Sequence, residues 1–200
     1  PPIYFYTYDV LKSYKGGIHM NKEKLKLNNQ VRMLWFQHSE WTRMAFASII
    51  FKNPDEAEVI NRLLRNPADF AYFLRYFYGH NIGAQFCTLL TEHLVIAADL
   101  VKATMAAETN KAEQINQRLY KNADEISAFL DSINPYWNSQ DWKKMFYMHL
   151  DLAKLIASQM IEGNYEKSIN TYDIFEAEVM NMADMMIDGI IKQFPYLFYW

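Results

Sequence analysis

Three histidines, His38, His93 and His149, each lie near the middle of a long stretch whose apolar residues recur at helical spacing. Each falls on the face that this spacing predicts to be buried. Imidazoles are the commonest protein ligands for transition metals, and they also serve as hydrogen-bonding groups in helical cores. At a rise of about 1.5 Å per residue, helices in rough register would bring the three imidazoles into one layer. We therefore expect a polar layer in the middle of the core.

Small residues follow each histidine by four positions, at Thr42, Ala97 and Ala153. Side chains at i and i+4 lie on the same helix face, so these residues leave room beside the imidazoles for a water or a substrate. Glu176, on the last long stretch, is the carboxylate that we expect beside the imidazoles. The other residues that we expect to hydrogen-bond to the imidazoles from neighbouring positions are Glu92, Asn122, Asp124 and Tyr172.

Two interpretations of this layer remain open. In the first, the imidazoles hydrogen-bond to neighbouring polar groups and fix the register of the helices, since an unpaired buried polar group costs about 1–3 kcal/mol. In the second, His38, His93, His149 and Glu176 bind iron, manganese or zinc. Bundle metal sites commonly use Glu-x-x-His pairs on one helix, and no such pair occurs here. This favours the first interpretation, a non-catalytic binding or structural protein, over a metalloprotein with oxidative or hydrolytic chemistry.

Capping signals divide the chain into helices with short connections. Asn53 and Asn66 are each followed by proline, the pattern of an N-cap and a first helical residue. Gly79 and Gly163 suit left-handed positions after helix ends, and Asn138 suits an N-cap. Because the connections are short, consecutive long helices should lie antiparallel, in an all-α up-and-down bundle with a four-helix core plus shorter helices. The predicted helices span 24–51, 55–65, 68–78, 83–107, 111–133, 139–161 and 165–193.

The composition restricts the function classes. With 51% hydrophobic residues, 6 Gly and 6 Pro in 200 residues, the chain is typical of a helical globular domain. A net charge of −3 gives no basic surface for nucleic acid, and the single cysteine excludes an intramolecular disulfide. No run approaches the ~18 apolar residues of a membrane span. We expect a cytoplasmic protein without a nucleic-acid partner, whose aromatic stretch 194–200 covers the bundle end or contacts a second copy.

The first residues have an unusual composition for a protein start. The stretch 1–19 has no initiator methionine, whereas "MNKEKLKLNN", which begins at Met20, is typical of the start of a protein. Lys15-Gly16-Gly17 can be encoded by a purine-rich ribosome-binding sequence placed a few codons before Met20. We therefore expect residues 1–19 to be a translated leader or disordered tail, and 20–200 to form a single helical-bundle domain.

Five blocks of the sequence resemble a protein family. They are "LWFQHSEWTRM" (34–44), "RLLRNPADFA" (62–71), "LLTEHLVIAADLVKA" (89–103), "SINPYWN" (132–138) and "GIIKQFP" (189–195). In order and spacing they resemble small all-helical hypothetical proteins from spore-forming bacteria, over roughly residues 28–195. The resemblance implies a bacterial protein with a helical fold, and no established activity.

The resemblance also bears on the histidines and on one activity label. His38, His93 and His149 lie in blocks that look like hallmarks of the family, whereas Phe36 stands where the family motif has glutamate. Some members are labelled acetylglutamate kinase. That activity needs an α/β nucleotide-binding fold with glycine-rich phosphate loops, and the sequence has neither.

Overall fold

The computed structural model describes residues 21–198, and all regular secondary structure in that range is helical. The all-α prediction is confirmed, and no helix end differs from its predicted position by more than three residues (His80 against 83). The helices are α2 (Lys22–Phe51), α3 (Glu56–Leu63), α4 (Asn66–Tyr78), α5 (His80–Met105), α6 (Thr109–Ile133), α7 (Ser139–Ile161), α8 (Tyr165–Gln193) and the 3-10 turn η2 (Pro195–Leu197).

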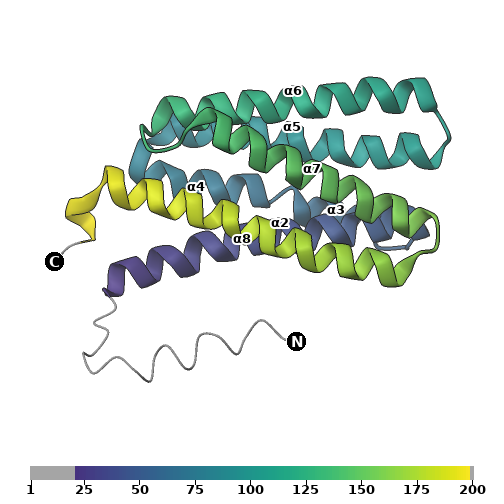
Figure 1. The fold of residues 1–200 in the computed structure, drawn as a ribbon, viewed down its shortest axis with the longest axis horizontal. Helices are drawn as coiled ribbons and strands as arrows, with labels where there is room; N and C mark the ends of the chain where they lie inside the picture. Colours follow the sequence, from purple (N-terminus) through teal and green to yellow (C-terminus); the bar gives the residue numbers. More distant parts are fainter. Residues whose placement is uncertain (1–20, 199–200) are drawn as a thin grey trace.

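Five of these helices are long, with 23 to 30 residues each, so one further helix extends the expected four-helix core. Short turns join α5 to α6, α6 to α7 and α7 to α8, and each pair packs side by side, as the up-and-down prediction requires (Figure 1). α2 closes the bundle by packing against α8, α5 and α7. The shorter α4 packs along α5, and α3 packs on α2.

Several helix ends follow the predicted signals. The Asn138 side chain accepts hydrogen bonds from the backbone N–H groups of Gln140 and Asp141 at the start of α7. Gly79 and Gly163 adopt φ of +84° and +75°, the positive values that glycine reaches without steric cost. These caps set where α4 ends and where α7 begins and ends, and therefore the height of each of their residues along the bundle.

Two predicted N-caps are wrong. The N-cap position of α3 is occupied by Asp55, not by Asn53. The N-cap position of α4 is occupied by Arg65, because Asn66 is already the first residue of the helix. The Asn66 side chain is fully buried and donates to the backbone carbonyl of Leu34 on α2. The Asn66 side chain therefore makes a contact with another helix, α2, and does not cap the start of its own helix.

An aromatic layer packs next to the histidines. The Trp35 and Trp142 rings stack with centroids 6.4 Å apart, and both are buried. Trp35 also meets the His38 ring edge-on at 5.7 Å, and Phe146 meets the His93 ring at 5.9 Å. This apolar layer forms one boundary of the site described below.

One helix in the described range, α5, has the length and mean hydropathy (1.3 over 18 residues) that a membrane span requires. The sequence expectation that no stretch comes near a span is therefore too strong for this helix. Only the length and composition of α5 indicate a membrane span, and the core helix of a bundle can have the same length and composition. Within the bundle, α5 packs against α4 and α6 and carries the buried His93.

The leader predicted for residues 1–19 lies outside the described residues, as do residues 199–200. Within the aromatic stretch, the Phe194 ring lies 5.5 Å from those of Phe77 and Tyr78, and Phe198 is buried. Part of the tail thus covers the bundle end, whereas contact with a second copy stays a prediction.

Candidate functional site

The three histidines meet in the middle of the bundle, as expected. His38 from α2, His93 from α5 and His149 from α7 are each 2% exposed. Their ring centroids are 6.4 Å (38 to 93), 5.4 Å (38 to 149) and 6.1 Å (93 to 149) apart. The three imidazoles therefore form a triangle, which we call the histidine cluster.

A buried asparagine fixes the orientation of the first ring. His38 Nδ1 lies 3.3 Å from Asn66 Oδ1, while Asn66 Nδ2 donates to the Leu34 carbonyl at 2.9 Å. Because the amide nitrogen is committed to a carbonyl, the amide oxygen faces the ring and accepts from it. This network assigns the ring proton to Nδ1 and leaves a lone pair on Nε2.

The same arrangement recurs at the second ring. His93 Nδ1 lies 2.9 Å from Asn122 Oδ1, and Asn122 Nδ2 donates to the Leu89 carbonyl at 3.1 Å. The predicted contact between Asn122 and the cluster is confirmed. Here too the proton is assigned to Nδ1 and the lone pair to Nε2.

The third ring faces a buried carboxylate. His149 Nδ1 lies 3.4 Å from Glu178 Oε2, and both side chains are at most 3% exposed. The contact is not aligned as a hydrogen bond, so Nδ1 and both carboxylate oxygens lack a hydrogen-bond partner among residues 21–198. The two groups are in contact, but the hydrogen-bonding capacity of both is unsatisfied. The same ring packs on Phe175 at 4.6 Å.

The predicted carboxylate was placed two residues too early. Glu176 is half-buried, and its charge acts on the Tyr172 hydroxyl, whereas Glu178 is the residue that reaches His149. On α8, Glu178 follows Phe175 by three positions and shares its buried face. Glu176 follows Tyr172 by four positions, on a face at the edge of the core.

Burial keeps two of the rings uncharged. It lowers the pKa of His93 to about 4, and the neighbouring His149 lowers it further while the Asn122 contact opposes the shift. Burial also holds the pKa of His38 well below its usual value, with further lowering by His149 and His93. At neutral pH both imidazoles are hydrogen-bonding groups without charge.

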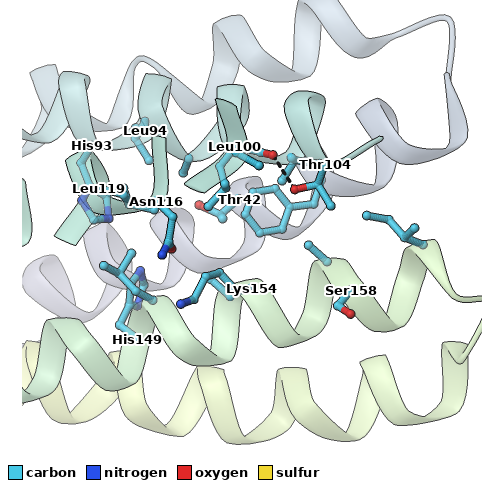
Figure 2. A pocket seen from close by; sticks show the side chains of 18 of the residues that line it. Thr42, His93, Leu94, Leu100, Thr104, Asn116, Leu119, His149, Lys154 and Ser158 are labelled. Carbon is cyan, nitrogen blue, oxygen red and sulfur yellow. Dashed lines mark hydrogen bonds between the residues drawn. The ribbon is translucent and has the colours of Figure 1, made fainter. Parts of the chain in front are cut away.

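A cavity of about 420 Å³ extends from the cluster between α2, α5, α6 and α7. The three histidines line its inner end, and Thr42, Ala97 and Ala153 line its walls one turn further along, as their small size predicts. Most other wall residues are apolar. Figure 2 shows His93 and His149 at one end and Thr104 and Ser158 towards the other. The exposed residues at that mouth are Thr104, Thr109, Glu113, Ser158 and Ile161.

We infer that the rings present their Nε2 edges to the cavity, since all three histidines line it. Their Nδ1 atoms face Asn66, Asn122 and Glu178, none of which lines the cavity. Among residues 21–198 no group hydrogen-bonds to any of the three Nε2 atoms. The buried Thr42 hydroxyl, on the cavity wall, is also without a hydrogen-bond partner in that range. The inner end thus offers three ring nitrogens without a hydrogen-bond partner, and on His38 and His93 these nitrogens carry lone pairs.

The remaining predicted partners lie away from the cluster. Glu92 is exposed, and Asp124 pairs with the Lys143 ammonium at 2.9 Å and accepts from the Tyr147 hydroxyl. Tyr172 lies under the Arg43 guanidinium. Phe36 is 36% exposed, so the departure from the family motif lies outside the cluster.

As the side chains stand, no group of three or more His, Cys, Asp or Glu residues within 21–198 has the spacing to hold a metal ion. Three imidazoles around a tetrahedral ion at about 2.0–2.1 Å would have centroids about 5.2 Å apart. The measured 5.4 to 6.4 Å is wider. A metal would therefore require the rings to move inward by up to about 1 Å.

Comparison with known proteins adds no further constraint. The resemblance to helical proteins of spore-forming bacteria therefore stays a prediction. No family model matches this chain, and neither a curated protein nor a solved structure matches it.

Proposed function

We propose that this protein is a non-catalytic binding protein that takes up a small molecule with an apolar body. The observation that carries the proposal is the cavity of about 420 Å³, apolar along its walls and closed at one end by three imidazoles. Small-molecule sites typically have volumes of about 300–1,000 Å³ and combine apolar walls with a few fixed polar groups. The asparagine contacts supply the fixed orientation, because they hold two rings in one tautomer.

The walls of the cavity and the polar groups along it fit this role. The apolar walls gain about 25 cal/mol for each Å² that a ligand removes from water. On the wall between the two ends, Lys154 is held by Asp151 and the Tyr120 hydroxyl, so its ammonium is already paired. The polar groups left for a ligand are therefore the histidine cluster and Thr42 hydroxyl at the inner end and the Asn116 side-chain oxygen on the wall.

Filling the cavity should abolish binding of an apolar probe. In Ala97→Phe the new ring would occupy the wall beside His93, because Ala97 lines the cavity. We expect the Kd of the uncharged fluorophore N-phenyl-1-naphthylamine to rise at least about tenfold, which is 1.4 kcal/mol. Fluorescence titration measures this. Val95→Phe is the matched control, since Val95 is 42% exposed on the same helix and does not line the cavity. Equal affinity in both variants would contradict the proposal.

A second candidate function is metal binding by His38, His93 and His149. It is favoured by the side-chain oxygens behind each Nδ1, because metal-binding histidines usually present their other ring nitrogen to a carbonyl or carboxylate. The wide ring spacing opposes it. Glu178 would orient His149 in this arrangement, and the cavity would leave a ligand position for water or substrate.

Metal analysis separates the two candidates. If the second holds, protein purified without an affinity tag contains about one equivalent of iron, manganese or zinc, and His93→Ala loses it. Removing the metal should then lower the Tm, because an ion bound only to the native state adds stability. His80→Ala is the control, since His80 is exposed at the start of α5. Metal-free protein that also fails to bind zinc, manganese or ferrous iron on titration would exclude this candidate.

A further inference from the structure

The inner end of the cavity has an excess of negative and electron-rich groups. The Nε2 lone pairs of His38 and His93 face the cavity, and the Glu178 carboxylate lies behind His149 with neither oxygen hydrogen-bonded among residues 21–198. In that range no lysine or arginine pairs with this carboxylate, whose one close ionisable partner is His149. A buried carboxylate without compensation is costly, so this site is complementary to a positive group.

The tautomers strengthen this argument. His38 and His93 carry their ring protons on Nδ1, where Asn66 and Asn122 accept them. Neither Nε2 can then donate a hydrogen bond to a ligand. A ligand carboxylate or phosphate at this position would meet lone pairs in front and the Glu178 carboxylate behind. The same groups would each accept a hydrogen bond from an ammonium.

We propose that the histidine cluster binds the primary ammonium group of an amine whose apolar chain fills the cavity. Each of the three N–H bonds would point to one Nε2, and Glu178 would balance the charge from behind His149. The proposal rests on the proposed function, since it names the ligand class for the same cavity. His93 and Thr104 lie eleven residues apart on α5, which gives about 16 Å for the chain to run toward the mouth.

The ring spacing is compatible with this occupant. Three imidazoles around an ammonium, with hydrogen bonds of about 2.9 Å, would have centroids about 6.6 Å apart. The measured 5.4 to 6.4 Å lies between this value and the about 5.2 Å of a tetrahedral metal site. The ring spacing alone does not distinguish a metal ion from an ammonium group. The apolar walls favour the ammonium group, because it carries an apolar chain.

The test compares n-octylamine, n-octanol and n-octanoate, three probes of equal chain length. Chelator-treated protein at pH 7.5 is titrated calorimetrically, after the naphthylamine assay has shown whether the cavity binds apolar molecules. We expect octylamine to bind at least about tenfold more tightly than octanol. Octanoate is expected to bind more weakly than both. This ranking is measured on the unchanged protein and does not depend on any variant folding.

A pair of variants on α8 tests the role of the carboxylate. Glu178→Gln removes the buried charge, and we expect the preference for octylamine over octanol to fall at least about fivefold. Glu176→Gln makes the same chemical change two residues away, beside Tyr172, and should leave the preference intact. Circular dichroism checks that both variants are folded.

The outcomes separate the two proposals. If the cavity binds the naphthylamine but octanoate or octanol binds as tightly as octylamine, the inference is overturned and the binding function stands. If the cavity binds none of these molecules, both fail. A stoichiometric metal that octylamine does not displace from untreated protein would also overturn the inference, in favour of the second candidate function.

Discussion

Lowering the pH from 7 to 5 is expected to destabilise the folded protein by about 2 kcal/mol through His93 alone. Burial lowers the pKa of this ring to about 4, whereas in the unfolded chain it titrates near 6.5. The unfolded state therefore binds more protons between these values, and stability rises with pH. The contribution is complete above about pH 6.5 and is lost as the pH falls toward 4. His38, whose pKa is also lowered, acts in the same direction.

Urea unfolding of chelator-treated protein at pH 7 and pH 5 measures this difference. In His93→Gln the change in unfolding free energy between the two pH values should shrink by about 2 kcal/mol, because glutamine does not titrate. His80→Gln replaces an exposed histidine and should retain the pH dependence of the unchanged protein. An unaltered pH dependence in His93→Gln would mean that the fold does not lower the pKa of this ring. The assignment of an uncharged His93 at pH 5 would then be wrong.

The sequence was sufficient for the parts of this fold that repeat along each helix. Capping signals and apolar spacing together located all seven helices of the described residues, because a buried stripe recurs with the helical period between one helix end and the next. The same spacing placed His38, His93 and His149 on buried faces near the helix midpoints. The small residues Thr42 and Ala97 were expected beside them for the same reason, and they line the cavity.

What the sequence could not supply are the contacts between helices. Asn66 satisfied a local capping rule, yet its amide bonds to α2 instead, and a single sequence contains no signal for that choice. On α8, two glutamates two residues apart compete for the core. Their position relative to Phe175 and Tyr172 is the one signal that could have selected Glu178 over Glu176. Asn66 and Glu178 are the two partners of the cluster that the sequence did not predict. Both contacts depend on how the helices are rotated against each other.

A close contact of this kind lies between α8 and the turn that precedes α7. A Cβ added at Gly189 would overlap the Nε1 and Cδ1 atoms of Trp137 and lie 2.8 Å from its Cε2. Trp137 is fully buried, and its Nε1 donates to the Met185 carbonyl at 3.1 Å. It also meets the Trp142 ring at right angles, so the indole has little room to move.

Gly189→Ala is therefore expected to destabilise the protein by about 2 kcal/mol or more. Alanine favours a helix interior over glycine by about 1 kcal/mol, but overpacking of a filled core costs about 1–3 kcal/mol. The displaced indole N–H, left buried without a partner, costs about 1–3 kcal/mol more. Urea unfolding measures the net loss. Ala177→Leu adds volume at an exposed position of the same helix and should change stability by less than about 0.5 kcal/mol.

A double-mutant cycle identifies the cause of that loss. In a Trp137→Phe background the smaller ring leaves space beside residue 189, so Gly189→Ala should cost at least about 1 kcal/mol less than in the unchanged protein. Additive costs would mean that the indole does not oppose the added methyl group. The close approach of α8 would then have another cause. A positive coupling would show that a glycine on α8 permits the indole contact that joins this helix to the α6–α7 turn, next to the aromatic layer that bounds the histidine cluster.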